Sequence, residues 1–191
     1  MKSILVSGYR SYELQIYRDN DPKLFFLKKL LTEKFIQKIE EGYTWFVITG
    51  QLGVELWTGE LIIELKDTYP DIQLAVLPPY EEMSSQWNES NQLLFQRVCQ
   101  GADYVEPTSQ KPYESPRQLQ ANQAFIIRNT EACLLVHDRE YPGKEKYLLD
   151  LIEVYQEKHE YHLEIIDFED LDWFVQIYQE NHPKELKDLG F

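Results

Sequence analysis

Basic residues are scarce in this sequence. Its 191 residues include 19 Lys and Arg against 33 Asp and Glu, which gives a formal net charge of −14 at pH 7. Binding to nucleic acids or to anionic lipids depends on basic side chains that neutralise phosphate groups. The charge balance therefore disfavours direct binding of DNA or RNA, and only a local basic patch would escape this conclusion.

Cysteine and histidine are also rare, and their spacing excludes the common metal sites. Cys99 and Cys133 lie in apolar contexts without a Cys-x-x-Cys or Cys/His spacing, so we expect two buried free thiols. The four histidines are spaced unlike metal ligands, and no metal is expected. No apolar run approaches the length of a membrane span, and the run after Met1 is too short for a signal peptide. The expected location is the cytoplasm.

Several well-known catalytic motifs are absent as well. The sequence has no Walker loop, no Gly-x-Ser-x-Gly nucleophile elbow and no His-Glu-x-x-His zinc helix. The turn at Gly8 also lacks the full Gly-x-Gly-x-x-Gly pattern of dinucleotide dehydrogenases. The function must therefore depend on other groups of residues.

What the sequence does contain is a regular alternation of short apolar runs and longer amphipathic segments. Hydrophobic residues make up 43% of the chain, which is enough for a substantial core. Such alternation predicts an α/β protein with a Rossmann-like, doubly wound, mostly parallel sheet of about six strands and helices on both faces. We expect residues 1–191 to form a single domain. The predicted strands are Ser3–Ser7, Trp45–Thr49, Ile72–Leu77, Asp103–Glu106, Ala132–His137 and Tyr161–Ile166.

Six helices are expected between and after these strands, from their apolar spacing and from capping and stop residues. The first begins at Asp21-Pro22 and stops at Gly42, the second spans about Gly53–Tyr69, the third about Glu82–Gln100 and the fourth Ser115 to about Thr130; the fifth includes Tyr147–Tyr155, and a short sixth follows Asp167.

A glycine-containing turn follows the second predicted strand. It contains Gly50 and Gly53, with Glu55 in the first turn of the next helix. Glycine lets the backbone approach a phosphate, and a helix N-terminus offers unpaired N–H groups and the positive end of its dipole. A tight strand-to-helix turn also needs glycine without a ligand, and an acid is favourable at a helix N-terminus by itself. A ligand loop and a structural turn therefore both remain open.

A second such turn places Gly8, Tyr9 and Arg10 after the first strand, at the edge where open α/β sheets bind ligands. Arg10 is suited to bidentate recognition of a phosphate or carboxylate. Tyr9 or Tyr12 could stack on a base or ribose, with ordinary packing as the alternative. Arg117, in the first turn of the fourth helix, could reach the same cleft.

Two acidic residues are candidates for catalysis. Glu55 begins the second helix, and Asp138 follows His137 at the end of the fifth strand. Either carboxylate could activate water or stabilise an oxocarbenium-like centre in the hydrolysis of a nucleotide or N-glycosidic bond. A histidine at a strand end is more often a hydrogen-bonded structural group, so that alternative also stays open.

Four segments together resemble the YpsA-like proteins of Gram-positive bacteria. They are Val6–Leu14, Thr49–Glu55, Pro78–Asn88 and Ala121–Asn129, and the similarity extends over nearly the whole chain. This family belongs to the SLOG superfamily, which joins DNA-processing protein A to the "Lonely Guy" phosphoribohydrolases, all with a Rossmann-like sheet. The resemblance implies a pocket for a nucleotide-derived ligand such as ADP-ribose or an NAD derivative, and a link to cell division or stress. By family position, this site would contain Gly8, Arg10, Gly50, Gly53 and Glu55.

The sequence departs from two branches of that superfamily. The Pro-Gly-Gly-x-Gly-Thr-x-x-Glu loop of the phosphoribohydrolases is absent, and the charge of −14 disfavours the single-stranded DNA binding of the DNA-processing branch. Three hypotheses remain: a nucleotide-binding regulatory protein that signals to a protein partner, a nucleotide or N-glycosidic-bond hydrolase, and an interaction module without a ligand. A homo-oligomer is compatible with each.

Overall fold

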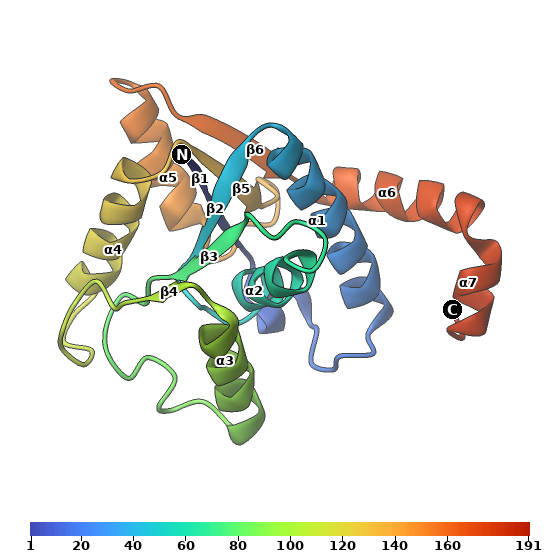
Figure 1. Cartoon of the computed structure of the whole chain (residues 1–191), viewed down its shortest axis with the longest axis horizontal. Helices are drawn as coiled ribbons and strands as arrows, with labels where there is room; N and C mark the ends of the chain where they lie inside the picture. Colours follow the sequence, from blue (N-terminus) through green and yellow to red (C-terminus); the bar gives the residue numbers. More distant parts are fainter.

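The computed structural model describes all residues, 1–191, and confirms the predicted fold class (Figure 1). The strands are β1 (Lys2–Gly8), β2 (Tyr43–Ile48), β3 (Gln73–Val76), β4 (Tyr104–Val105), β5 (Ala132–Val136) and β6 (His162–Ile166). The helices are α1 (Pro22–Glu40), α2 (Val54–Leu65), α3 (Glu89–Gly101), α4 (Arg117–Arg128), α5 (Lys146–Gln156), α6 (Phe168–Asn181) and α7 (Pro183–Asp188), with a 3-10 helix, η1, at Ser11–Leu14.

All six strands are parallel and form one sheet in the order β4-β3-β2-β1-β5-β6. The chain moves outward from β1 to β4 and then crosses back, which places β5 on the free side of β1. The direction of winding therefore reverses between β1 and β5. At such a reversal, open α/β sheets bind ligands in the crevice outside the carboxyl ends of the strands.

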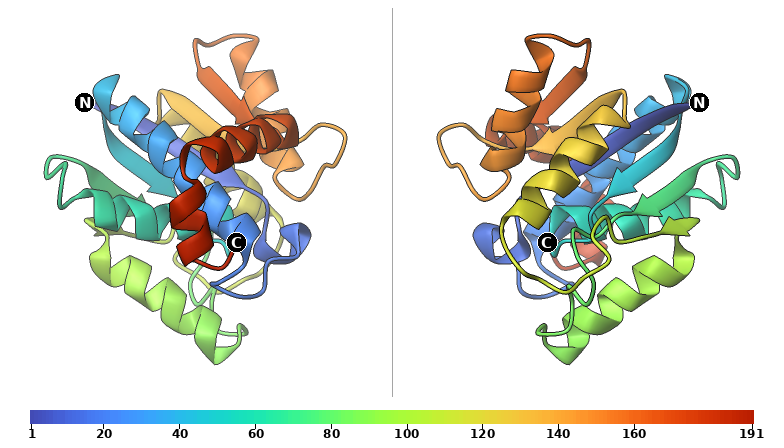
Figure 2. Two further views of the ribbon diagram at one scale, coloured as in Figure 1. Left: turned by 90° about the vertical axis from the view of Figure 1, so that its right-hand side faces the viewer. Right: turned by 90° about the vertical axis from the view of Figure 1, so that its left-hand side faces the viewer.

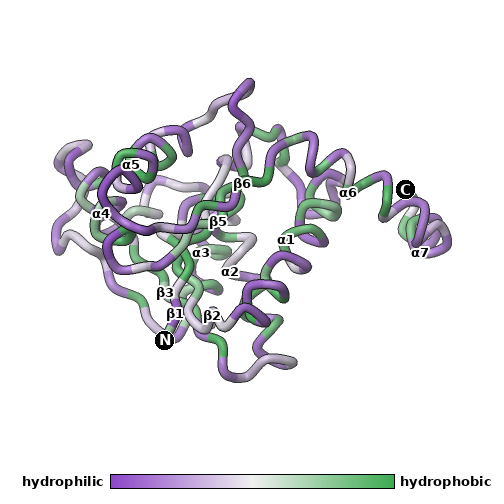
Figure 3. The backbone as a smooth tube through the Cα atoms, turned by 90° about the horizontal axis from the view of Figure 1, so that it is seen from above, coloured by the Kyte–Doolittle hydropathy of each residue, from purple (hydrophilic) through white to green (hydrophobic).

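Helices cover the two faces of the sheet unequally (Figure 2). α1, α2, α3 and α6 pack on one face, in a core cluster of 25 buried residues that includes Ile4 and Phe46. α4 and α5 pack on the other face, in a smaller cluster of 11 that includes Leu5 and Cys133. Consecutive strand residues such as Ile4 and Leu5 point to opposite faces, so both must be apolar. The apolar strands accordingly lie at the centre of the molecule (Figure 3).

Several boundaries differ from the sequence-based expectation. α3 begins at Glu89 and not near Glu82, because the Asn88 side chain caps it and Glu82 has a φ of +58°, which a helix does not allow. α6 has 14 residues and is not short; a capping box between Asp167 and Asp170 starts it. The short helices η1 and α7 were not expected, since four and six residues show no clear apolar period. None of the helices combines the length and hydrophobicity that crossing a membrane requires.

Candidate functional site

The two predicted glycine turns lie side by side, with their backbones in direct contact. The Val54 N–H donates a hydrogen bond to the carbonyl of Tyr9 (3.1 Å), which joins the start of α2 to the loop after β1. Gly53 has a φ of +95°, and a Cβ atom there would lie 2.4 Å from the Tyr9 carbonyl oxygen and 2.6 Å from the Ser11 nitrogen. Only glycine combines this conformation with so close an approach. Gly53 therefore allows the two loops to pack backbone against backbone; we call this contact the seam between them.

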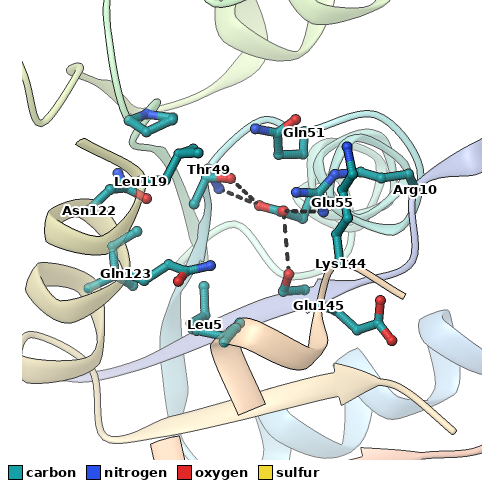
Figure 4. Close-up of a pocket in the computed structure, with 14 residues that line it drawn as sticks. Leu5, Arg10, Thr49, Gln51, Glu55, Leu119, Asn122, Gln123, Lys144 and Glu145 are labelled. Carbon is teal, nitrogen blue, oxygen red and sulfur yellow. Dashed lines mark hydrogen bonds and ion pairs between the residues drawn. The ribbon is translucent and has the colours of Figure 1, made fainter. Parts of the chain in front are cut away.

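Glu55, in the first turn of α2, is 3% exposed and fully engaged. One carboxylate oxygen accepts hydrogen bonds from the backbone N–H (2.6 Å) and the hydroxyl (2.7 Å) of Thr49. The other accepts a bond from the Ser7 hydroxyl (3.3 Å) and lies 3.9 Å from the Arg10 guanidinium (Figure 4). Glu55 thus ties the ends of β1 and β2 to the start of α2.

Burial raises the pKa of Glu55, while the charge of Arg10 and the hydrogen bonds from Thr49 and Ser7 act in the opposite direction. Removal from water disfavours a charged carboxylate, whereas a nearby cation and donated hydrogen bonds favour it. Burial is the larger effect, so the pKa lies above its ordinary value. Arg10 is the main group that compensates the buried negative charge.

A narrow pocket opens beside these residues, at the carboxyl ends of β1 and β2 (Figure 4). Its free volume is about 30 Å³, room for one or two water molecules. Arg10 and Lys144 lie on one side and α4 on the other, with Thr49, Gln51 and Glu55 between them. The lining is mostly polar and consists of Leu5, Ser7, Arg10, Thr49, Gln51, Glu55, Pro79, Leu119, Asn122, Gln123, Ile126, Lys144, Glu145 and Leu148.

Charged groups of both signs converge on this pocket: the cations Arg10 and Lys144 and the carboxylates of Glu55 and Glu145. Besides the cations Arg10 and Lys144, three helices begin beside it: α2 supplies Glu55, α4 supplies Leu119 from its first turn, and α5 begins directly after Glu145. Each helix N-terminus carries about half a positive charge. The two cations balance the two lining carboxylates, so the helix N-termini supply the excess of positive charge that favours an anionic group at this edge of a strongly acidic chain.

The side chains opposite the two cations come from α4. Asn122 is buried and donates hydrogen bonds to the Leu77 carbonyl (2.8 Å) and the Thr108 hydroxyl (2.9 Å). These bonds fix α4 to the loops that follow β3 and β4. The neighbouring Gln123 is half-buried and points into the pocket (Figure 4). Its amide can therefore meet a ligand at a defined place.

Tyr9 holds the loop after β5 in place through hydrogen bonds to its backbone. Its hydroxyl accepts a hydrogen bond from the Asp138 N–H (2.7 Å) and donates one to the Tyr141 carbonyl (2.7 Å). Its ring is 3% exposed and stacks on Phe168, with 5.3 Å between ring centres. Burial raises the pKa of Tyr9 to about 12, so the hydroxyl keeps the proton that it donates. The ring is outside the pocket lining.

Two residues of η1 contact the same loop at Lys144. The Glu13 carboxylate accepts hydrogen bonds from the backbone N–H groups of Arg10 (2.8 Å) and Lys144 (2.9 Å). The Lys144 ammonium lies 5.7 Å from the centre of the Tyr12 ring, which is 47% exposed. Glu13 thus holds the backbone at both cations, and Tyr12 offers an exposed aromatic face beside them.

Of the predicted site residues, Arg10 and Glu55 line the pocket, and the glycines lie behind it. A Cβ atom on Gly8 would lie 2.9 Å from Val136, and one on Gly50 would lie 2.7 Å from the Phe95 ring. Both glycines therefore permit close packing of the elements around the site.

Two other predicted residues lie apart from the pocket lining. Arg117 is exposed on the first turn of α4. The Asp138 carboxylate accepts hydrogen bonds from the N–H groups of Glu140 (2.9 Å) and Phe168 (3.2 Å). It therefore organises the loops after β5 and β6, on the far side of Tyr9. The structure does not bring Asp138 and Glu55 into one site.

Sequence reasoning missed Thr49, Gln51, Lys144 and Glu145 as lining residues. Glu145 accepts a hydrogen bond from His137 (2.6 Å), and both side chains are buried. Thr49 ends a predicted strand and the other three lie in the segments after predicted strands, so their position at the carboxyl edge was a usable signal, but their spacing matches no motif. No group of three or more His, Cys, Asp and Glu side chains is arranged to hold a metal ion.

Comparison with known proteins identifies close relatives along the whole chain. The sequence profile of the YspA SLOG family matches residues 4–171, which include every pocket-lining residue. The UPF0398 protein of Lactobacillus gasseri is 44% identical over 186 residues, or 97% of this chain and 98% of that protein. The UPF0398 protein of Lactiplantibacillus plantarum is 40% identical over the full length of both chains. That of Listeria innocua is 45% identical over 168 residues, or 88% and 92% of the two chains.

Proposed function

Because the chain belongs to the YspA SLOG family, we propose that it binds a nucleotide or nucleotide derivative in the pocket between Arg10, Lys144 and α4. Family membership supports a nucleotide-related function. ADP-ribose and NAD-derived nucleotides are the first candidates, since each joins phosphate groups to ribose and an aromatic base.

The observation that carries this proposal is the concentration of positive charge in an acidic protein. Two cations and three helix N-termini meet at the pocket and together exceed the charge of its two carboxylates, Glu55 and Glu145, whereas the chain has a net charge of −14. A phosphate is the ligand group that best fits such a place, because it accepts several hydrogen bonds and carries the complementary charge.

The arrangement of side chains suggests how the parts of a nucleotide would be held. The phosphates would contact Arg10 and Lys144, and the ribose hydroxyls would bond to the amides of Gln51 and Gln123. The exposed ring of Tyr12 would stack on the base. The free volume of about 30 Å³ is too small for a whole nucleotide, so the ligand would occupy the mouth and displace the long side chains of both cations.

The role that we propose for this binding is regulatory. Occupation of the pocket would fix Lys144 and, through it, the loop 138–144 on the surface, where a protein partner could detect it. A partner in cell division or in the stress response is the first candidate, by the family resemblance.

One observation favours hydrolysis as a second candidate function. Glu55 is buried in the pocket wall, and burial raises its pKa above the ordinary value, which is the direction that favours a carboxyl group as general acid. In this alternative, Glu55 would protonate a leaving group of a nucleotide or an N-glycosidic bond. Its carboxylate would first have to exchange one of its present hydrogen bonds for the substrate.

A thermal unfolding assay with ADP-ribose, NAD, AMP and ATP tests both candidates. A ligand at about 100 times its dissociation constant adds about 2.7 kcal/mol to the free energy of unfolding, enough to raise Tm by several degrees. Chromatography of each mixture afterwards separates the two functions: unchanged ligand supports the binding protein, and a new product supports the hydrolase.

Variants of the two cations locate the binding site. Arg10→Gln and Lys144→Gln should each weaken the binding of the active ligand by at least about tenfold in calorimetric titration, because each removes a charge-assisted contact to phosphate. Arg18→Gln and Lys146→Gln are matched controls, since both side chains are exposed and outside the lining. Equal binding by all four variants would place the site elsewhere. A protein that responds to no nucleotide would support the interaction module instead.

A further inference from the structure

One part of the sheet lacks the helical cover that it has elsewhere. On the face that carries α4 and α5, these helices pack over the region of β1 and β5, with Ile126 and Leu148 against Leu5 and Leu135. No third helix lies in front of β2, β3 and β4 on this face (right-hand view of Figure 2). In a fully covered doubly wound sheet, another helix would occupy this place.

The uncovered region forms an apolar groove with a free volume of about 650 Å³. We define the groove by its floor and its wall. The floor consists of Trp45 and Val47 on β2, Ala75 on β3 and Leu77 directly after β3, and the wall consists of Ala121 and Phe125 on α4. The Phe125 side chain, in the last turn of α4, is 43% exposed. The groove therefore leaves apolar surface in contact with water, which association would remove.

The charge around this groove differs from that of the rest of the chain. Residues 115–130 contain two arginines and no acid, and they are the longest stretch of the sequence without Asp or Glu. The groove lining carries one acidic side chain, Glu106, and one basic side chain, Arg128. Most other surfaces of a protein with a net charge of −14 would repel a second copy of it. The charged side chains of the groove lining, one of each sign, add nothing to this repulsion.

We propose that the groove is a homodimer interface in which two copies of the chain pair around a two-fold axis beside α4. In a two-fold interface, the same patch meets itself, so the patch must contain both a projection and a hollow that receives it. Phe125 is the projection and the groove is the hollow. Arg128 of each copy faces Glu106 of the other, which makes the charges self-complementary. The second copy thus supplies the cover that the uncovered strands lack.

Sedimentation velocity over roughly a hundredfold range of protein concentration tests this proposal. The wild-type chain should pass from monomer to dimer as concentration rises. Phe125→Asp and Arg128→Glu should each raise the dissociation constant of the dimer at least about tenfold, because each places an acid in the shared interface. Trp173→Asp is the matched control: Trp173 is also an exposed helical aromatic residue (65%), but it lies on α6, outside the groove. This variant should dimerise normally.

A charge swap makes the test specific. Glu106→Arg should weaken the dimer as Arg128→Glu does, and the double variant should recover most of the loss. Circular dichroism and Tm at low concentration establish that every variant is folded. A wild-type chain that stays monomeric throughout, or a dimer that survives both Phe125→Asp and Arg128→Glu, would overturn the proposal.

Discussion

The pocket and the groove lie on two sides of one helix, and they are built on opposite principles. Towards the pocket, α4 presents polar groups such as Asn122, whose hydrogen bonds fix the surrounding loops. Towards the groove, it presents Phe125, which is only partly covered. The pocket is narrow, charged and internally bonded, whereas the groove is wide and apolar. A surface of the first kind is prepared for a small anionic ligand, and one of the second kind for a macromolecular surface.

The largest effect is expected at the seam that supports the pocket. Gly53→Ala should lower the free energy of unfolding by about 3 kcal/mol or more, because its Cβ would overlap the backbone at Tyr9 and Ser11 and its φ is +95°. Gly190→Ala is the matched control, since Gly190 has a similar φ of +81° with no atom within 4 Å. Its cost should be about 1 kcal/mol or less. Urea unfolding measures both, and similar losses for the two variants would contradict a contact between the loops.

The next effect concerns the buried ion pair. Arg10→Gln should lower the free energy of unfolding by about 2 kcal/mol at pH 8, because it leaves Glu55 buried without a cation. The double variant Arg10→Gln/Glu55→Gln should regain most of that loss, since a neutral amide needs no counter-charge. A double-mutant cycle of unfolding free energies gives the coupling. If the two losses simply added, the pair would have no role in stability.

A smaller effect should appear in the pH dependence of stability. Burial raises the folded-state pKa of Glu55 above its ordinary value of 4.5, so the folded chain binds more protons than the unfolded chain in this range. The free energy of unfolding therefore falls as the pH rises from about 4.5 through the folded-state pKa. Glu55→Gln should make this decline shallower. Glu180→Gln, at an exposed position on α6, should leave it unchanged; equal slopes in all three proteins would contradict the raised pKa.

The smallest effect is expected at Phe125, on the groove side of α4, and Ile126 on the core side of the same helix is the comparison. Ile126, which is 1% exposed, belongs to the core, so Ile126→Ala should cost about 3 kcal/mol. Phe125→Ala should cost less than about 1 kcal/mol in the monomer, because the ring is already partly in water. Urea unfolding at low protein concentration keeps dimerisation from contributing. A large loss at Phe125 would show that the groove is part of the folding core.

The sequence was sufficient to predict the sheet and its main helices, because buried strands and amphipathic helices follow strong apolar periods. The predicted start of α3 was wrong, since no local sequence pattern indicates the left-handed backbone conformation of Glu82. The sequence placed Gly53 and Glu55 at the start of the second helix, where the structure has them. The contact of Gly53 with the loop after β1 depends on residues about forty positions away, and no short motif records such a contact.

The same reason explains the residues that sequence reasoning did not find. Lys144 reaches the pocket only because Glu13 and Tyr9 hold the loop after β5 against the loop after β1. The direction of the Tyr9 side chain could not be predicted either, since a tyrosine beside a glycine turn can point towards the pocket or away from it. Long-range hydrogen bonds, and not local pattern, determine which of the loop residues meet at this edge.

The position of Arg10 couples anion binding to the protonation of Glu55. Its guanidinium lies 3.9 Å from Glu55 and is the charge that opposes the effect of burial on that carboxylate. An anion that draws Arg10 towards itself weakens this compensation and raises the affinity of Glu55 for a proton. Anion binding and proton uptake are then thermodynamically linked. The pocket would take up its ligand more tightly in acid than in base, although no histidine lines it.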